Sequence, residues 1–309
     1  MRNARATFVS IDGKRVDPAA ATVSVFDTTV QRGNGAFEVV RVLEGGSLRA
    51  PALHLDRLQR TAGIIGLELP SRSALHAWLA EAARVGAEAD AAAGGAGEGA
   101  VRLLATRGGA SLPVRGLEPL RVSPQIVTCF ERLPAWPASM RLMPLVAPWH
   151  PAGAEEGWET AKWLSYGPNV LSSSKAHRAG FDDALLLTRP PGASGTAAPI
   201  GDAHVLDGPN FAVAWFRFGR FEVPSWRENG MLQSTSATLA MRAAQEMDVQ
   251  VVEGRFTLDE ALQADELCVM SSTRDLLPVS AVGDAQFEKD GPRLARLREA
   301  MKAAARHYE

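Results

Sequence analysis

Hydrophobic and polar residues follow two different periods along the chain. Alternation at every second position is typical of a strand, and recurrence at every third or fourth position is typical of a helix that faces a core. Strands are predicted at 7–11, 21–26, 37–42, 101–107, 125–130, 140–146, 182–187, 212–216, 220–223, 249–252 and 267–270. Helices are predicted at 54–66, from Ser71 or Ser73 to about 82, at 169–179, at 236–247 and near the end of the chain. Because both types occur throughout, we predict an α/β fold.

The predicted helix at 54–66 carries an arginine close to its apolar stripe, which consists of Leu55, Leu58, Ala62 and Ile65. Arg57 lies beside this stripe rather than on the polar back of the helix. Two interpretations stay open. Arg57 is either a surface arginine whose aliphatic stem packs against the protein, or an anion ligand that reaches into a cleft.

The strand at 37–42 follows the sequence Gly33-Asn34-Gly35 and alternates Phe37, Val39 and Arg41 with Glu38, Val40 and Val42. Two glycines this close allow backbones to approach each other. A single Gly-x-Gly is a weak nucleotide-binding signal, and no third glycine follows at the dinucleotide spacing. We therefore predict a tight turn here and no nucleotide site.

Two low-complexity segments and a proline-rich segment interrupt the pattern. Residues 86–100 are rich in Gly and Ala, residues 189–199 are rich in Gly, Ala and Pro, and we expect both to be loop insertions. Prolines in the segment 133–138 suit a stiff connection between domains. We therefore expect a small N-terminal α/β domain at 1–134, a linker at 135–139 and a larger C-terminal domain at 140–309.

Composition and charge limit the class of protein. Apolar residues make up 46% of the chain and charged residues 22%, as in ordinary globular proteins. The net charge of −2 favours neither nucleic acid nor an anionic membrane as a partner. No apolar run approaches the roughly 20 residues that span a bilayer, and no secretory signal pattern is present. We expect a cytoplasmic protein in which Cys129 and Cys268 are buried thiols and the scattered histidines form no metal site.

Among the five lysines, Lys162 is the one expected to lose contact with water. The other four lie in predicted turns or on polar helix faces: Lys14, Lys175, Lys289 and Lys302. Lys162 has aromatic neighbours in the sequence, at Trp158, Trp163 and Tyr166. Removal from water lowers the pKa of an amine, and the neutral amine attacks carbonyl carbons. Lys162 is either a surface lysine or a nucleophile in a dry pocket, and its neighbours favour the nucleophile.

Two clusters of hydroxyl side chains are placed to bind a phosphate. The first lies at the predicted N-terminus of a helix and contains Ser234, Thr235 and Ser236; the second follows a strand and contains Ser271, Ser272 and Thr273. Free N–H groups, the helix dipole and short hydroxyls together favour an anion. Capping of the helix by its own hydroxyl groups is the alternative for the first cluster.

A nucleophilic lysine, a phosphate site and an arginine together suggest pyridoxal 5'-phosphate (PLP) as a cofactor. PLP also needs a carboxylate that keeps its pyridine nitrogen protonated, so that the ring accepts electrons. Asp207, at the start of the segment 207–211, is the candidate for this carboxylate. Its sequence, Asp-Gly-Pro, is also that of an ordinary turn.

Six segments of the chain, in this order, resemble the class IV (fold-type IV) PLP-dependent aminotransferases. This family includes branched-chain aminotransferases, D-amino-acid transaminases and aminodeoxychorismate lyases. The resemblance extends from Asp27 to Val279 and rests on residues 32–38, 54–58, 162–171, 207–211, 230–236 and 264–272. It implies a small N-terminal α/β domain, a larger C-terminal α/β pseudo-barrel domain, and PLP in the cleft between them. It also implies a homodimer.

The resemblance further implies roles for individual residues. Lys162 would form a Schiff base with PLP and move the substrate proton, Tyr166 would bond the ring hydroxyl, and Asp207 would face the ring nitrogen. The phosphate would be bound by Arg57, Thr235, Ser236, Ser271 and Ser272. The substrates would be an amino acid and a 2-oxo acid. Phe37 would line their site, and the carboxylate ligand would come from Arg32, Arg41, Arg102 and Arg107.

Three functions stay open at this stage. The first is a transaminase for branched-chain or D-amino acids. The second is an aminodeoxychorismate lyase, which makes 4-aminobenzoate and pyruvate on the same scaffold. The third is a non-catalytic binding or scaffold protein. Asp207 and Ala237 stand where the family usually has glutamate and arginine, and Arg32 stands where it usually has tyrosine.

Overall fold

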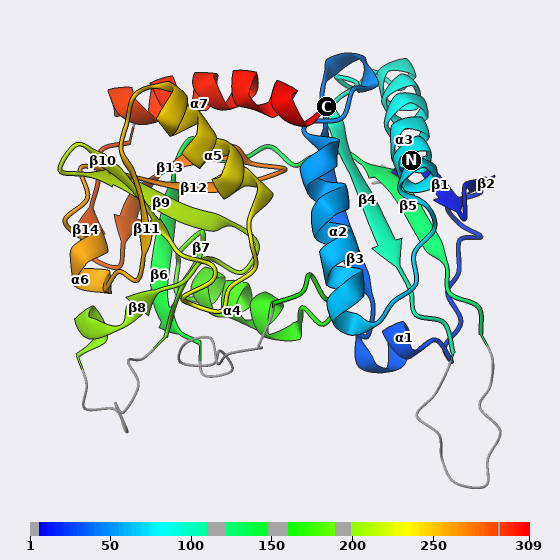
Figure 1. Cartoon of the computed structure of the whole chain (residues 1–309), viewed down its shortest axis with the longest axis horizontal. Helices are drawn as coiled ribbons and strands as arrows, with labels where there is room; N and C mark the ends of the chain where they lie inside the picture. Colours follow the sequence, from blue (N-terminus) through cyan, green and yellow to red (C-terminus); the bar gives the residue numbers. More distant parts are fainter. Residues whose placement is uncertain (1–5, 110–121, 148–159, 189–198, 290) are drawn as a thin grey trace, which may run out of the picture. The chain divides into compact units, whose positions relative to one another are not determined.

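The computed structural model describes residues 6–109, 122–147, 160–188, 199–289 and 291–309. The chain forms two compact units (Figure 1). Unit 1 consists of Met1–Ala135, Ala161–Tyr166 and Arg306–Glu309, and unit 2 consists of Trp136–Thr160 and Gly167–Ala305. The segment that carries Lys162 therefore belongs to unit 1, although most of the second half of the chain forms unit 2.

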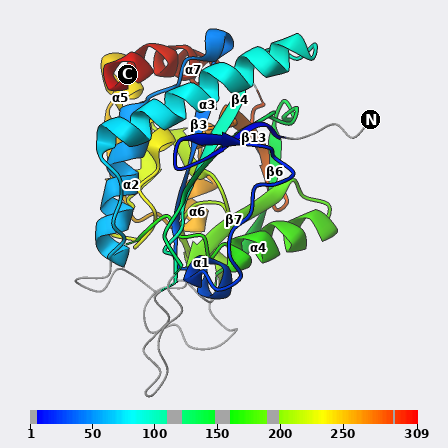
Figure 2. The ribbon, with the colours of Figure 1, turned by 90° about the vertical axis from the view of Figure 1, so that its right-hand side faces the viewer.

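Unit 1 is built on an antiparallel sheet with helices on one face. Its strands are β1 (Ala6–Ile11), β2 (Lys14–Val16), β3 (Ala36–Val42), β4 (Gly99–Ala105) and β5 (Ile126–Glu131), in the order β2-β1-β5-β4-β3. Its helices are α1 (Thr28–Arg32), α2 (Pro51–Ile65) and α3 (Arg72–Ala92), with the short 3-10 turns η1 (Glu44–Gly46) and η3 (Arg306–Tyr308). Helices α2 and α3 cover the sheet (Figures 1 and 2). Phe8, Val40, Leu58, Leu79 and Phe130 are part of the core between them.

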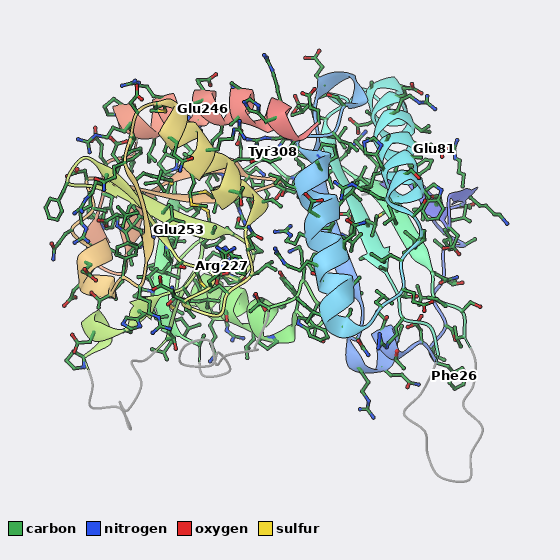
Figure 3. All side chains as sticks on the ribbon, in the orientation of Figure 1. Phe26, Glu81, Arg227, Glu246, Glu253 and Tyr308 are labelled. Carbon is green, nitrogen blue, oxygen red and sulfur yellow. The ribbon has the colours of Figure 1, made fainter. Side chains whose placement is uncertain are left out.

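The strand predicted at 7–11 is confirmed as β1, but the strand predicted at 21–26 is absent, and β1 pairs with the short strand β2. Asp12 and Gly13 have φ values of 50° and 76°, as expected for a two-residue hairpin turn. Strand β2 ends at Val16, and residues 21–26 form no strand. Pro18 lacks an N–H donor, and the Asp17 side chain accepts a hydrogen bond from Ala19 N, so the chain turns away from the sheet. Phe26 is consequently 51% exposed (Figure 3).

The prediction of a loop insertion at 86–100 is wrong, because α3 continues to Ala92. Alanine is the strongest helix former, and the alanine-rich sequence extends the helix instead of ending it. Asp90, near its end, is buried, forms an ion pair with Arg132 and accepts a hydrogen bond from Gly97 N at 3.1 Å. The turn that follows is therefore held to the helix by one buried carboxylate.

Unit 2 is built on a mixed sheet that curls back on itself. Its strands are β6 (Met140–Val146), β7 (Asp183–Thr188), β8 (His204–Val205), β9 (Ala212–Arg217), β10 (Arg220–Pro224), β11 (Val251–Gly254), β12 (Glu266–Ser271), β13 (Asp275–Val282) and β14 (Ala285–Gln286). Their order is β11-β10-β9-β12-β13-β6-β7-β8, with β14 beside β13. Val205 N, in β8, donates to Phe256 O at 2.8 Å, just beyond β11. Because the two ends of the strand order meet here, the predicted pseudo-barrel is confirmed.

The helices of unit 2 follow the predicted pattern. They are α4 (Gly167–Arg178), α5 (Thr235–Glu246), α6 (Leu258–Ala261) and α7 (Pro292–Ala305), with the 3-10 turn η2 (Ile200–Asp202). Helices α5 and α7 lie side by side (Figures 1 and 2). The apolar face of α7, formed by Leu294, Leu297, Met301 and Ala304, is buried. The sequence pattern does not predict β13, because Pro278 interrupts it. The second predicted insertion, at 189–199, lies outside the described residues except for Pro199.

The role of Asp90 gives a testable prediction for the fold. Asp90→Ala should destabilise the protein by about 1–3 kcal/mol, because it removes buried hydrogen bonds and leaves Arg132 without its partner. The measurement is the midpoint of urea unfolding. Glu88→Ala, on the same helix, is the matched control, because the Glu88 side chain is 63% exposed. Equal midpoints for the two variants would contradict this role.

Candidate functional site

The segment that carries Lys162 is bound along the first residues of β3. Phe37 N donates to Lys162 O at 3.2 Å, and Leu164 N donates to Gly35 O at 3.0 Å. A Cβ atom at Gly35 would lie 2.9 Å from Leu164 Cδ1 and 2.8 Å from Ala105 O. The predicted close approach of backbones at Gly33–Gly35 is therefore confirmed, and glycine at position 35 is what allows Lys162 to lie beside β3.

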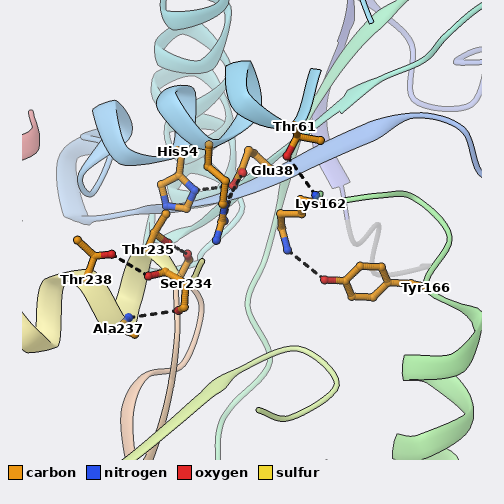
Figure 4. Close-up of polar contacts among 11 residues, drawn as sticks. Glu38, His54, Thr61, Lys162, Tyr166, Ser234, Thr235, Ala237 and Thr238 are labelled. Carbon is orange, nitrogen blue, oxygen red and sulfur yellow. Dashed lines mark hydrogen bonds and ion pairs between the residues drawn. The ribbon is translucent and has the colours of Figure 1, made fainter. Parts of the chain in front are cut away.

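Two aromatic rings, those of Phe37 and Tyr166, lie beside the Lys162 amine, and Figure 4 shows its bond to Tyr166. Nζ donates a hydrogen bond to Tyr166 Oη at 3.2 Å and lies 4.3 Å from the centre of the Phe37 ring. The Phe37 and Tyr166 rings are 5.0 Å apart in an edge-to-face arrangement. Cation–π and hydrogen-bond contacts therefore fix the amine from two sides.

The expected surroundings of Lys162 need two corrections. Its side chain is half-buried rather than dry, and Trp163 is exposed. Because residues 162–164 are extended, successive side chains point in opposite directions, so Trp163 faces away from the lysine. Trp158 lies outside the described residues. The elimination of the other lysines is confirmed, since all of them are exposed: Lys14, Lys175, Lys289 and Lys302.

Arg57 is a buried residue held by a glutamate. Its Nε and Nη2 atoms donate to the two carboxylate oxygens of Glu38, both at 2.7 Å. His54 Nδ1 lies 2.7 Å from Glu38 Oε2. All three side chains are buried, and Glu38 is 1% exposed. The interpretation of Arg57 as a surface arginine is therefore wrong. The fork-shaped pairing uses one edge of the guanidinium and fixes the direction of the other.

The pKa values of this group show which charges are present. Burial alone would raise the pKa of Glu38, but the charge and hydrogen bonds of Arg57, with a hydrogen bond from His54, lower it to about 2. Burial lowers the pKa of His54, and the positive charges of Arg57 and Lys162 oppose the effect of Glu38. His54 is therefore neutral near pH 7, and its Nδ1–H donates to the carboxylate.

Helix α2 supplies most of this arrangement. His54, Arg57 and Thr61 follow one another at intervals of three and four residues, so they lie on one face of the helix. Thr61 Oγ1 accepts a hydrogen bond from Lys162 N at 3.1 Å. The sequence analysis does not identify Glu38, His54 or Thr61 as site residues. The signal for Glu38 is its position between Ala36 and Val40 on the core face of β3, where a carboxylate needs a partner.

In unit 2, the two hydroxyl clusters lie next to each other. Ser234 is the N-cap of α5, and its Oγ accepts from Ala237 N at 3.2 Å. Thr235 Oγ1 lies 3.5 Å from Ser272 Oγ, which joins the start of α5 to the turn after β12. Figure 4 includes Ser234 and Thr235 at the start of α5. Ser236 is buried. Hydroxyl groups from two elements therefore meet at the N-terminus of a 12-residue helix, which suits an anion.

Ser271, the last residue of β12, and Asp207, in the loop after β8, belong to the same unit. Ser271 Oγ accepts from Arg274 N at 3.2 Å, so this hydroxyl stabilises the turn after β12. Asp207 is half-buried in the loop after β8, and its carbonyl accepts from Leu186 N at 2.8 Å. Gly208 N donates to Phe211 O at 2.8 Å, so the expected turn is also present.

The four arginines expected at the substrate have different surroundings. Arg102 lies 6.0 Å from the centre of the Phe37 ring and pairs with Glu131 at 3.2 Å. Arg41 pairs with Glu98. Arg107 donates to the carbonyl oxygens of Ile65 and Gly66 and so caps the C-terminus of α2. Arg32 is exposed at the end of α1.

Metal sites, membrane spans and reactive thiols are other features that could indicate a function in the described part of the chain. Within the described residues, no group of His, Cys, Asp and Glu side chains could hold a metal ion. No described helix is both long and apolar enough to cross a bilayer. Cys268 is buried, as predicted, whereas Cys129 is half-buried, and burial followed by the charge of Glu131 raises the pKa of the Cys129 thiol to about 12. Neither cysteine is suited to act as a nucleophile.

Unit 1 offers a fixed amine and a buried cation, and unit 2 offers a hydroxyl-rich helix N-terminus. The amine can bond to an aldehyde carbon, and the cation and the helix N-terminus are each suited to a phosphate. These are the groups that PLP requires, so the described residues fit that cofactor.

Comparison with known proteins leads to the same family. Residues 35–282 match the family model described as amino-transferase class IV. A protein of Methanocaldococcus jannaschii, provisionally named a branched-chain-amino-acid aminotransferase, is 26% identical over 92% of this chain and 88% of its own length. A Mycobacterium tuberculosis protein, named a bifunctional aminodeoxychorismate lyase and D-amino acid transaminase, is 28% identical over 66% of this chain and 64% of its own length.

A solved structure of similar fold is the fold IV transaminase CpuTA1 of Curtobacterium pusillum. Its TM-score is 0.79 at 24% identity, and the match covers 99% of this chain and 100% of that one. The resemblance stated from the six sequence segments is thereby confirmed, and the non-catalytic alternative is not supported. The chain belongs to the class IV aminotransferases and is an enzyme that uses pyridoxal phosphate.

Proposed function

We propose that this enzyme transfers an amino group between an amino acid and a 2-oxo acid, with Lys162 as covalent anchor of the cofactor and as proton carrier. The observation that carries the proposal is the position of Lys162. Among the described residues it is the lysine that is not exposed, and its amine is held by Tyr166 and faces Phe37.

The type of amino donor follows from the relatives. One is named a branched-chain-amino-acid aminotransferase and another a D-amino acid transaminase, so we propose a donor of one of these two types. The second name of the M. tuberculosis relative, aminodeoxychorismate lyase, supports a lyase activity as the alternative. On either substrate the same lysine would act.

When bound, PLP supplies a positively charged pyridine ring that withdraws electrons from the substrate Cα. The protein then has to move a proton, and Lys162 Nζ is the group proposed to carry it. Tyr166 Oη accepts a hydrogen bond from this amine, and its phenol would bond the ring hydroxyl of the cofactor. Phe37, 7% exposed, would limit the access of water on one side of the amine.

We assign the cofactor phosphate to Arg57 and to the hydroxyl groups at the start of α5 and after β12. Arg57 would supply the charge, and its guanidinium is oriented because Nε and Nη2 both donate to Glu38. Thr235, Ser236, Ser271 and Ser272 would supply hydroxyl or N–H donors, supported by the contact between Thr235 and Ser272. A helix N-terminus adds the favourable end of its dipole.

We assign the ring nitrogen to Asp207 and the substrate carboxylate to an arginine near Phe37. Asp207 is supported by its place in the sequence, where the family usually has glutamate. Arg102 is favoured over Arg41, Arg107 and Arg32, because it lies over the Phe37 ring that also faces Lys162.

Larger features of the protein also remain proposals. We propose the domains 1–134 and 140–309 with the linker 135–139, and a homodimer as the working form. We also propose a cytoplasmic enzyme, which is supported by two free thiols that a reducing compartment would preserve.

The proposed function is tested by a panel of amino donors with pyruvate and 2-oxoglutarate as acceptors. The wild type should convert a branched-chain or D-amino donor, and Lys162→Ala should lose at least a thousandfold in rate, because the same amine anchors the cofactor and carries the proton. After borohydride reduction, mass spectrometry of the wild type should find the cofactor on Lys162. Lys175→Ala, at an exposed position, is the control and should behave as the wild type. A reduced cofactor on another lysine would refute the assignment.

A further prediction concerns how the charge of Glu38 makes the stability of the protein depend on pH. Its pKa is about 2 in the folded protein against an ordinary 4.5, so its stabilisation is complete above pH 4.5 and is lost as the pH falls toward 2. Glu38→Gln should destabilise the cofactor-free protein at pH 7 by about 3–5 kcal/mol, because Arg57 stays buried without a counter-charge. Between pH 5 and pH 3 the variant should then lose less stability than the wild type does.

Urea unfolding at several pH values measures both effects. Glu81→Gln, at an exposed position of α3, is the control and should keep the pH dependence of the wild type. The same variants should be titrated with PLP, and Glu38→Gln should bind it more weakly because Arg57 is no longer oriented. An unchanged pH profile in Glu38→Gln would show that this pair does not stabilise unit 1.

The third prediction concerns Asp207. Asp207→Asn removes the charge and nearly keeps the shape, so PLP should still bind. Exchange of the substrate α-hydrogen with solvent deuterium should slow by a hundredfold or more, about 3 kcal/mol, because the ring nitrogen loses its charged partner. Asp202→Asn, exposed in η2, is the control. A rate within about threefold of the wild type would leave Asp207 as a turn residue only.

A further inference from the structure

Arg274 is a buried cation in unit 2 that the proposed mechanism does not use. It lies between β12 and β13, directly after the Ser271–Thr273 turn. Its side chain is 8% exposed. The guanidinium carbon lies 4.4 Å from the centre of the Trp136 ring and 5.3 Å from the centre of the Phe211 ring. The charged group is therefore enclosed by two aromatic rings.

The polar partners of Arg274 are fewer than a buried guanidinium needs. Nη1 donates to Asn210 Oδ1, and Nη2 lies 3.7 Å from Asp183 Oδ2. Nε is buried and has no hydrogen-bond partner among the described residues. The Asp183 carboxylate already accepts bonds from Ser173 and Ala184 on its other oxygen. Burial lowers the pKa of Arg274, and Asp183 only partly opposes this effect.

Such an arrangement is not explained by stability alone. A buried charge with a distant counter-ion costs free energy, and an apolar side chain of similar volume is often at least as stable. An arginine at this position therefore suggests a function that depends on its length, its planar shape and its donors.

The contacts of Arg274 connect two loops. On one side, its backbone N–H bonds Ser271 Oγ at 3.2 Å, and Trp136 Nε1 donates to the carbonyl of Thr273 at 3.0 Å. On the other side, its guanidinium contacts Asn210 and Phe211. The first loop carries hydroxyl groups assigned to the phosphate, and the second begins with Asp207.

The Asp207–Phe211 loop has a second attachment. Asn169 Nδ2, in α4, donates to Pro209 O at 2.7 Å. The loop is also closed on itself by the bond from Gly208 N to Phe211 O. Arg274 and Asn169 therefore hold the loop at adjacent residues, while Asp207 lies at its start.

We propose that Arg274 is a positioning residue that fixes the Asp207–Phe211 loop relative to the Ser271–Thr273 turn. In this way it would hold the Asp207 carboxylate at the pyridine nitrogen while the phosphate is bound by the turn. The proposal rests on the roles assigned above to Asp207 and Ser272. It also accounts for aspartate at position 207, because a shorter side chain requires a more firmly placed loop.

The test measures the protonation of the pyridine nitrogen of the bound cofactor directly. The wild type and variants are loaded with PLP labelled with ¹⁵N in the ring, and the ¹⁵N chemical shift reports how far that nitrogen is protonated. Asp207→Asn should move the ¹⁵N chemical shift toward the value of neutral pyridine. The size of this change is the reference for the other variants. Arg274→Gln should move the shift in the same direction by at least a third of that amount. It should also slow α-hydrogen exchange about tenfold.

Three further variants complete the design. Asn210→Ala removes the acceptor of Arg274 at an exposed position and should reproduce part of the shift even if Arg274→Gln folds poorly. Arg274→Lys keeps the charge without the planar group. It should therefore restore less than half of the change in ¹⁵N chemical shift that Arg274→Gln causes. Arg217→Gln is the control, because Arg217 is also a buried arginine of unit 2, pairs with Glu222, and contacts neither loop in the interactions described here.

The outcomes distinguish the proposed role of Arg274 from the proposed role of Asp207. If Asp207→Asn moves the ¹⁵N shift while Arg274→Gln and Asn210→Ala keep the wild-type value, the role of Arg274 is refuted and that of Asp207 stands. If Asp207→Asn leaves the shift unchanged, the assignment of Asp207 fails and the role of Arg274 fails with it. An effect of Arg217→Gln equal to that of Arg274→Gln would also refute the proposal, because it would reflect general destabilisation.

Discussion

The ion pair between Glu38 and Arg57 is the interaction on which the buried polar group between β3 and α2 depends. A lone arginine at this depth would be costly, because the charge would have left water without compensation. Glu38 compensates it with two bonds of 2.7 Å, and neutral His54 supplies a further donor to the same carboxylate. The pair thus allows a full positive charge to be held inside the core of unit 1, with the direction of the guanidinium fixed.

The position of Lys162 depends on the same two elements. Strand β3 provides Glu38 on one face and Phe37 on the other, and it also binds the backbone of Lys162. Helix α2 provides Arg57 and, one turn later, Thr61, which accepts from Lys162 N. The Lys162 amine and the Arg57 guanidinium are therefore both positioned by β3 and α2. A shift of either element would move both groups together.

Much of this could be predicted from the sequence, and the failures have physical causes. Periodicity identified α2, α5 and α7 and most strands, because each buries one regular face. It failed at residues 86–92, where composition suggested a loop but alanine and the buried Asp90 extend a helix. It also failed at β13, where Pro278 interrupts a strand.

The sequence indicated which residues to consider for the candidate site more than which contacts they make. Lys162, Arg57 and the two hydroxyl clusters were singled out from residue type and context, and the role of Tyr166 was implied by the family resemblance. Glu38 and His54 were not, because their role exists only when a strand and a helix meet. Of the aromatic neighbours expected for Lys162, Tyr166 is confirmed, whereas Trp163 faces away and Phe37, distant in sequence but adjacent in space, contacts the amine.

The attachment of the Lys162 segment to β3 has a consequence for the sheet itself. Strand β3 is an edge strand of unit 1, and such edges attract other chains unless they are covered. The segment 162–164 covers the beginning of this edge, and Leu48 and Arg49 pair with its other end. The Lys162 segment therefore also shields part of this edge from pairing with other chains. Changes in its length or register would expose the edge as well as displace Lys162.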